Sequence, residues 1–214
     1  MKTAILKKLL VGMLVMLIAP AAFARLDSDD YNFPVAEEGT EGQRVLAEKT
    51  GEIVATYRGN SAWNNNTLYL MLDAFGKPGD DGNYANDMLL FNNKTNRVGT
   101  SLSLGKFDAG TELIFRLHTV YWENASKVNE FFTGEAGRNA DGYEHARVES
   151  DWKKDETLVS FEDLYGGLFD YNDMSFSFTN TIAAPVPEES TLILGLAGLG
   201  LMGWMNRRKK NGKA

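Results

Sequence analysis

The sequence of 214 residues contains no cysteine. This absence excludes disulfide bridges, thiolate nucleophiles and cysteine-ligated zinc. Histidine is almost as scarce, since His118 and His145 are the two examples. The chain also lacks the Gly-x-Ser-x-Gly, His-Glu-x-x-His and phosphate-loop motifs. We therefore expect a protein that is not an enzyme.

Basic side chains are sparse in the central part of the chain. Residues 25–186 carry 27 acidic and 14 basic side chains, which gives a net charge of about −13. A body this acidic repels phosphate backbones, so nucleic-acid binding is disfavoured. It attracts cations, although a solvated acidic surface explains the same charge.

The N-terminus has the three-part pattern of a secretion signal. Lysines near the start precede an apolar run, and a small-residue site follows at Ala22-Phe23-Ala24. We predict a signal helix over residues 1–24, cleaved after Ala24. A retained membrane anchor is the weaker alternative, because the apolar run is short for a membrane span.

The C-terminus joins an apolar run to a basic cluster. Residues 191–206 are almost entirely apolar, and residues 207–214 begin with Arg207-Arg208. A helix of fifteen apolar residues rises about 22 Å, short of a hydrocarbon core of roughly 30 Å, so it spans only with local thinning or snorkelling. We predict a linker over 183–190, a transmembrane helix over 191–206 and a basic cytoplasmic tail over 207–214. This places the body outside the inner membrane.

The end of the chain also resembles a known sorting signal. Pro187-Glu188 is followed by a Ser-Thr pair, a Gly- and Leu-rich span and Arg207-Arg208. This order resembles the PEP-CTERM tag, which a membrane-embedded transpeptidase, an exosortase, recognises and processes in Gram-negative bacteria that make exopolysaccharide. The resemblance implies transient anchoring in the inner membrane and a final place at the cell surface or in the extracellular matrix. Glu189 departs from the tag, whose third residue is usually proline, and a plain tail anchor is the alternative.

Between these ends the hydrophobic pattern is that of β-strands. Apolar residues alternate with polar or small ones over 53–57, 102–104, 113–117 and 174–178, whereas 67–72 is apolar throughout. Alternation predicts half-buried antiparallel strands, and the continuous run predicts a strand buried on both faces. Turn clusters separate these strands. The sequence therefore predicts an all-β domain over 51–182, an antiparallel β-sandwich or jelly roll.

The segment 25–50, just before this domain, is polar and acidic. Thr40-Glu41-Gly42-Gln43 has the spacing of a capping box, and Gly51 can end a helix. We therefore predict a short helix over residues 43–50.

The densest group of oxygen-bearing side chains flanks the glycine pair Gly166-Gly167. It consists of Glu162, Asp163, Asp170, Asn172 and Asp173. Calcium takes six to eight oxygen ligands, and carboxylates of one loop supply several of them. The spacing does not fit an EF-hand. We predict a calcium site here, with a polar turn, in which the side chains bond their own backbone, as the alternative.

The same residues resemble a domain of unknown function found in secreted bacterial proteins. Its pattern is a Phe-Glu-Asp-Leu stretch, a glycine pair and Asp-x-Asn-Asp before a final strand, and the resemblance covers residues 99–181. It implies a β-sandwich and calcium binding, with Asp163, Asp170, Asn172 and Asp173 on the pattern. Leu168-Phe169 departs from it.

A weaker candidate cluster lies earlier in the chain. It consists of Asp80, Asp81, Asn83 and Asp87, with Gly82 in the middle. Such a loop can hold a cation, but a hairpin turn explains it equally well.

Several residues leave the function open. Trp63, Trp122 and Trp152 could form a sugar-binding face, although core packing is the commoner use of tryptophan. We expect His118 at the surface, and His145 in a turn or at a metal. The first hypothesis is a non-enzymatic, calcium-binding module with a role in envelope or exopolysaccharide-matrix structure or adhesion. The alternatives are a carbohydrate-binding module and a glycoside-active enzyme, which needs two carboxylates about 5–10 Å apart.

Overall fold

The computed structural model describes residues 32–187, and this part of the chain consists of β-strands and one short 3-10 turn. The strands are β1 (Arg44–Ala47), β2 (Gly51–Gly59), β3 (Asn65–Leu70), β4 (Met88–Asn92), β5 (Ser101–Phe107), β6 (Glu112–Leu113), β7 (Phe115–Val120), β8 (Val128–Phe132), β9 (Ala146–Lys153), β10 (Glu156–Phe161), β11 (Met174–Thr179) and β12 (Thr181–Ala184), and the turn is η2 (Ala136–Arg138). The predicted all-β class is confirmed.

The predicted signal helix (1–24), the transmembrane helix (191–206) and the basic tail (207–214) lie outside the described residues. Most of the predicted sorting tag also lies there, since its first residue, Pro187, is the last one described. Among residues 32–187, no helix has the length and apolar character needed to cross a membrane.

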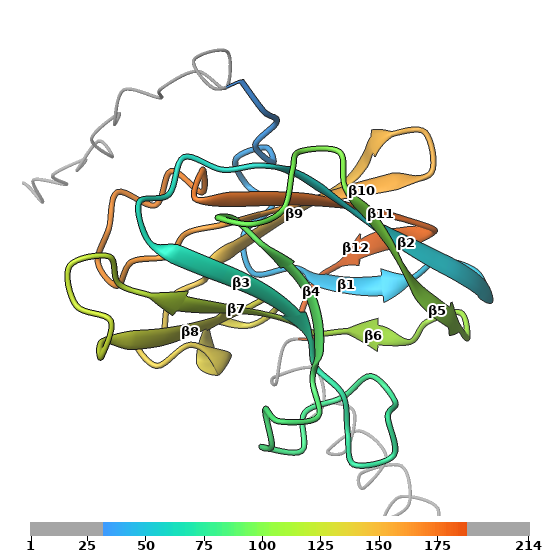
Figure 1. The fold of residues 1–214 in the computed structure, drawn as a ribbon. Coiled ribbons are helices and arrows are strands. Elements are labelled where there is room, and N and C mark those ends of the chain that lie inside the picture. Colours follow the sequence, from blue (N-terminus) through green and yellow to red (C-terminus); the bar gives the residue numbers. More distant parts are fainter. Residues whose placement is uncertain (1–31, 188–214) are drawn as a thin grey trace, which may run out of the picture.

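The strands form three antiparallel sheets (Figure 1). The largest has the order β5-β2-β11-β10-β9, the second β4-β3-β7-β8 and the smallest β12-β1-β6. The large sheet makes one layer, and the two smaller sheets pack against it (Figure 1). The result is a sandwich of antiparallel sheets, and its finer assignment as a jelly roll stays a prediction.

The core lies between these layers and is rich in aromatic rings. Tyr57 of β2 and Phe176 of β11 have ring centroids 5.7 Å apart, and Phe91 of β4 stacks on Phe176 at 5.8 Å. All three rings are buried. The alternation over 53–57 therefore identified an inward face correctly, because residues two apart on a strand point to the same side.

The predicted helix over 43–50 is wrong. Residues 44–47 form β1, which pairs with β12 on one side and with β6 on the other. Val45 and Ala47 point into the core while their neighbours are partly exposed. A capping-box spacing is a local signal, and here pairing with two distant strands outweighs it.

The strand over 174–178 is buried on both faces, not on one as predicted. The serines of its second face are covered by polar contacts. Ser175 and Ser160 share a hydroxyl–hydroxyl hydrogen bond of 2.9 Å, and the amide of Ala36 donates to Ser160 at 2.9 Å. The chain before β1 thus crosses this face, which the alternation could not indicate.

The predicted strand over 113–117 is divided in two. β6 pairs with β1, whereas β7 pairs with β3 and β8, and Ile114 lies between them. The amide of Met71 donates to the carbonyl of Ile114, which closes this junction. Because the strand changes sheets here, one run of alternating residues contributes to two layers.

Candidate metal centre

The β10–β11 loop, residues 162–173, lies at one end of the sandwich together with the β2–β3 and β7–β8 loops. This end is on the left of Figure 1. The amide of Ser61 donates to the carbonyl of Asn172 at 3.0 Å, which joins two of the loops. The amide of Trp122 donates to Asn64 Oδ1 at 3.3 Å, which joins the third.

Three carboxyl groups of the β10–β11 loop come together. Oxygen atoms of Glu162, Asp163 and Asp173 all lie within 4.8 Å of one another. Glu162 is 3% exposed and Asp163 2% exposed, which is rare for ionisable side chains without a partner. We call these three residues the carboxylate cluster. Their arrangement can bind a metal ion.

Asp163 is held by two asparagines from the start of β3. The Asn64 side-chain amide donates to Oδ1 at 3.0 Å, and that of Asn66 donates to Oδ2 at 2.6 Å. No motif of the sequence singled out these asparagines as part of the site. Their spacing of two residues ahead of a strand was the available signal, since it places both side chains on one face.

The other two cluster carboxyls accept backbone amides. Asp173 Oδ2 accepts from the amide of Asp163 at 2.8 Å. The carboxyl of Glu162 accepts from the amides of Leu164 and Tyr171. These bonds fix the oxygens in place but leave the three groups facing one another.

Crowding and burial favour the protonated forms of the cluster. Burial, assisted by the charges of Asp163 and Glu162, raises the pKa of Asp173 to about 9. Burial, assisted by the charges of Asp170 and Asp163, raises the pKa of Glu162 to about 7. Burial also raises the pKa of Asp163, against the opposing amide hydrogen bonds. Like charges in a site of low dielectric cannot all ionise unless a cation compensates them.

The glycine pair of the loop serves two different purposes. Gly166 has φ +66°, a conformation that favours glycine. A Cβ atom on Gly167 would lie 2.6 Å from Glu162 Oε1, so the chain passes directly over this carboxyl group. Glycine at 167 thus permits the close approach that encloses Glu162.

The second half of the loop has an unusual backbone. Phe169 and Tyr171, on either side of Asp170, have φ +52° and φ +55°. Such values are uncommon for bulky residues and require support from the surroundings. Tyr171 supplies part of it, since its hydroxyl donates to the carbonyl of Glu144 at 2.9 Å.

His145 lies beneath the loop and is fully buried. Its Nε2 is 3.0 Å from Asp141 Oδ2, and its Nδ1 is 3.3 Å from the carbonyl oxygen of Glu162. Its ring packs against Phe131 at 4.3 Å and Phe169 at 5.3 Å. His145 therefore supports the loop from below, and its ring is not part of the carboxylate cluster.

Asp170 and Asn172, also predicted as ligands, lie outside the group of three. Asp170 contributes through its charge, which raises the pKa of Glu162 and Asp173. The side-chain oxygen of Asn172 bonds the hydroxyl of Ser61. The structure thus brings together three of the five residues singled out in this loop.

The weaker cluster before β4 forms turns. Asp80 and Asp81 each accept the amide two residues ahead, at 2.8 and 2.9 Å, and Asn83 accepts the amide of Ala85 at 3.2 Å. Asp87 instead pairs with Arg116 at 2.9 Å. Asp80, Asp81 and Asn83 thus each form an Asx turn in the connection between β3 and β4, and Asp87 is bonded to an arginine.

His118 and the three tryptophans that the sequence suggested as functional residues lie at separate places. His118 is half-buried and its Nδ1 is 2.7 Å from Glu130 Oε1. Trp63 and Trp122 are exposed at the same end as the carboxylate cluster, with ring centroids 5.9 Å apart. Trp152 is on β9, where Arg58 lies over its ring. Core packing, the commoner use of tryptophan, does not apply to the exposed pair.

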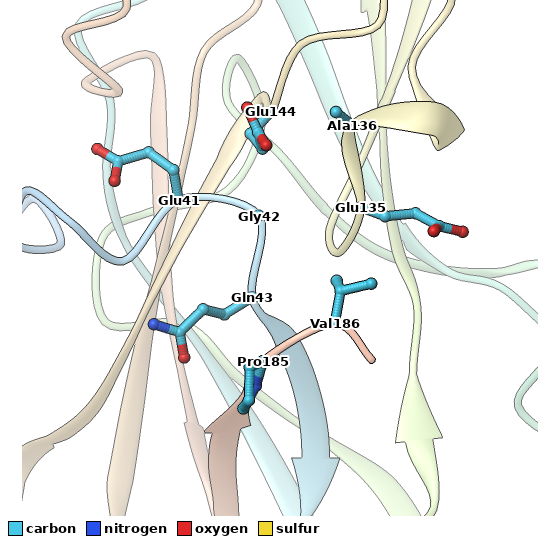
Figure 2. Close-up of a pocket in the computed structure, with 8 residues that line it drawn as sticks. All are labelled: Glu41, Gly42, Gln43, Glu135, Ala136, Glu144, Pro185 and Val186. Atoms are coloured by element: carbon cyan, nitrogen blue, oxygen red, sulfur yellow. The ribbon is translucent and has the colours of Figure 1, made fainter. Parts of the chain in front are cut away.

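A pocket of about 560 Å³ opens elsewhere on the surface (Figure 2). It lies between the segment before β1, the η2 turn and the chain after β12, and no member of the carboxylate cluster lines it. Its acidic residues are Glu41, Glu135 and Glu144, and the carboxyl groups of Glu41 and Glu135 point in opposite directions in Figure 2. The carboxyl groups of Glu41 and Glu135 therefore do not face each other across the pocket.

The chain matches no family model, no curated protein and no solved structure.

Proposed function

We propose that the protein is an exported β-sandwich of the bacterial envelope or exopolysaccharide matrix, with a calcium ion bound at the carboxylate cluster. In this proposal its role is structural or adhesive and not enzymatic. The single observation that carries the proposal is the convergence of the carboxyl groups of Glu162 and Asp163, which are buried, and of Asp173, which is partly buried.

The donor set favours a hard cation. The cluster offers carboxyl oxygens, and neither cysteine nor the ring of His145 joins it. Oxygen-only sites suit calcium, magnesium and manganese, whereas zinc and copper prefer nitrogen or sulfur ligands.

Burial favours calcium over magnesium. Magnesium keeps several of its water molecules, whereas calcium accepts irregular shells of protein oxygens. Glu162 and Asp163 are 3% and 2% exposed, which leaves little access for a hydrated ion. Asn66 adds a further oxygen near the site, because its buried Oδ1 has no hydrogen-bond partner among the described residues.

The extracellular part of the proposal is supported by the two ends of the sequence. The signal-like N-terminus and the resemblance of the C-terminus to a PEP-CTERM tag both direct the body out of the cytoplasm. Calcium is available there, and an exosortase-type transpeptidase would be the processing partner. N-terminal sequencing of the mature protein should find Arg25 first.

Calcium titration of the purified protein by calorimetry, with thermal melts in calcium and in EDTA, tests the proposal. At a calcium concentration 100 times the Kd, binding stabilises the fold by about 2.7 kcal/mol, which raises the Tm by about 5–10 °C in a domain of this size. Asp173→Asn should abolish this rise, because it removes one of the three converging carboxylates. Asp170→Asn should only weaken calcium binding.

Asp81→Asn is the matched control, since Asp81 lies in an exposed turn away from the cluster. It should retain the full calcium response. Equal melts of the unmodified protein in calcium and in EDTA, with no heat of binding, would contradict the proposal.

A further inference from the structure

Two large aromatic side chains are exposed side by side near the carboxylate cluster. Trp63, in the β2–β3 loop, is 77% exposed, and Trp122, in the β7–β8 loop, is 62% exposed. Their ring centroids are 5.9 Å apart and their planes are inclined by 47°. Tryptophan carries the largest apolar surface of any side chain. Two tryptophans exposed together at one end of a domain therefore indicate a ligand-binding site.

The backbone on which these rings stand is fixed. The amide of Trp122 donates to Asn64 Oδ1, and the side-chain amide of Asn93 donates to the carbonyl of Asn64 at 2.9 Å. Lys94 Nζ donates to the carbonyl of Ala62, next to Trp63, at 3.0 Å. A pair of rings on an ordered backbone binds a ligand with less loss of conformational entropy than a flexible pair.

Charge excludes two kinds of ligand that also use exposed aromatic rings. Single-stranded nucleic acids stack their bases on tryptophan, but they need a basic surface along the phosphates. Residues 25–186 carry a net charge of about −13. The same charge opposes contact with anionic lipid surfaces. An uncharged ligand meets no such repulsion.

The exposed area of the two tryptophans is small for an interface with a second copy of the chain. A stable protein interface buries about 800 Å² on each partner. Two tryptophans together supply about 300–500 Å² even when fully covered. Their neighbours along the chain, Asn65, Glu123 and Asn124, are exposed and polar. The tryptophan pair therefore has the size for one or two flat rings of a ligand, and by itself it is too small for an interface with a folded protein.

We propose that Trp63 and Trp122 form a binding platform for a neutral polysaccharide. The C–H faces of pyranose rings pack on the indoles, and the flanking asparagine side chains can hydrogen-bond sugar hydroxyls. This inference extends the matrix role proposed above by naming the class of partner. It needs the tryptophan pair and does not need the calcium ion.

Affinity electrophoresis in native gels tests the platform. The probes are four neutral polysaccharides, namely hydroxyethylcellulose, xyloglucan, galactomannan and dextran, with alginate as an anionic polysaccharide and phosphatidylcholine–phosphatidylglycerol vesicles as a lipid surface. At least one neutral polysaccharide should retard the protein. Trp63→Ala and Trp122→Ala should each weaken that affinity about tenfold or more, on the scale of aromatic stacking.

Trp152→Ala is the matched control, because Trp152 lies on β9 beneath Arg58 and apart from the platform. It should keep the affinity of the unmodified protein. Thermal melts of the three variants verify folding, and both platform variants should melt close to the unmodified protein, since their rings are exposed.

Three results would overturn this inference. They are retardation by none of the four neutral polysaccharides, binding to alginate or vesicles only, and equal loss of affinity in Trp152→Ala. Gels run in calcium and in EDTA separate it from the calcium proposal. Retardation that depends on both platform tryptophans supports the platform in either buffer. The calcium titration and the thermal melts test the calcium site separately.

Discussion

Gly167 is important to the proposed site because it has no side chain. An added methyl group would lie 2.6 Å from Glu162 Oε1, closer than van der Waals contact allows. Since the surrounding chain is bonded to neighbouring loops, the Glu162 carboxyl group would have to leave its present position beside Asp163 and Asp173. A small change outside the ligand set would thus disturb the proposed site.

Gly167→Ala should weaken calcium binding about 10- to 100-fold, the usual range for residues that orient metal ligands. Isothermal titration calorimetry measures the change. Gly137→Ala is the control, because a Cβ atom at Gly137 would meet nothing within 4 Å. Equal calcium affinity in Gly167→Ala and the unmodified protein would show that Glu162 is not a ligand.

The raised pKa values of Glu162 and Asp173 predict how stability depends on pH without calcium. The folded protein keeps protons on these groups up to pH values of about 7 and about 9, whereas the unfolded chain releases them near pH 4. Between these limits the folded state binds more protons than the unfolded state, so stability falls as the pH rises.

Thermal melts in EDTA should therefore show a Tm that decreases steadily between pH 5 and pH 9. Saturating calcium should reduce this decrease, because the ion compensates the ionised carboxylates. Asp173→Asn should flatten the part of the curve above pH 7, since Asp173 has the higher pKa. A Tm in EDTA that rises over the same interval would contradict the assignment of the cluster.

At the scale of single elements, the sequence predicted those strands whose burial follows alternation. It identified the inward face of β2 from Tyr57, and it found the phenylalanine face of β11 but not the burial of its serine face. It also singled out the β10–β11 loop, because acidic residues around a glycine pair are visible without a structure. These signals are local, and a single segment of chain contains them.

Contacts between distant segments could not be predicted in the same way. Asn64 and Asn66 reach Asp163 from almost 100 residues earlier in the chain. The capping-box spacing before β1 predicted a helix, and its strand partners β6 and β12 lie too far away in sequence to be recognised. Alternation along the strand predicts that Arg116 lies on the polar, exposed face, yet it is 3% exposed.

Arg116 links several elements of the four-stranded sheet. From β7 it pairs with Asp87, just before β4, at 2.9 Å and with Glu130 of β8 at 2.7 Å. Its guanidinium lies between the rings of Tyr69 and Tyr84, at 4.4 and 4.3 Å from their centroids. The side chain of Asp87 is 1% exposed, so loss of Arg116 would leave a buried carboxylate without its cation.

Arg116→Met should lower the free energy of unfolding by about 3–5 kcal/mol, the typical effect of removing one partner of a buried ion pair. Urea denaturation followed by tryptophan fluorescence measures it. Arg97→Met, at an exposed position in the β4–β5 connection, should change stability by less than about 0.5 kcal/mol. A loss below about 1 kcal/mol in Arg116→Met would mean that the guanidinium is not essential to this junction.

At the scale of the whole molecule, the two ends of the described chain meet in one sheet. β1 pairs with β12 over four residues and with β6 over two. The guanidinium of Arg44 also donates to the carbonyl of Pro185 at 3.1 Å. Most of the support for β1 therefore comes from the last strand.

A chain that ends after Asn180 should lose β12 and leave β1 as an exposed edge strand, paired only with the two residues of β6, which favours aggregation. We expect its Tm to fall by at least about 5 °C. Size-exclusion chromatography and thermal melts measure both effects. A chain that ends after Pro187 keeps all the described contacts and should behave as a folded monomer. Equal behaviour of the two truncated chains would show that β12 contributes little.

The pairing of β1 with β12 also limits when this sheet can form during folding. Synthesis proceeds from the N-terminus, so the first strand waits for a partner that leaves the ribosome more than 130 residues later. Distant pairings of this kind form slowly. The β12-β1-β6 sheet of a nascent chain therefore stays incomplete until the final strand arrives. In the export proposed above, the chain would reach the translocation channel before this sheet is finished.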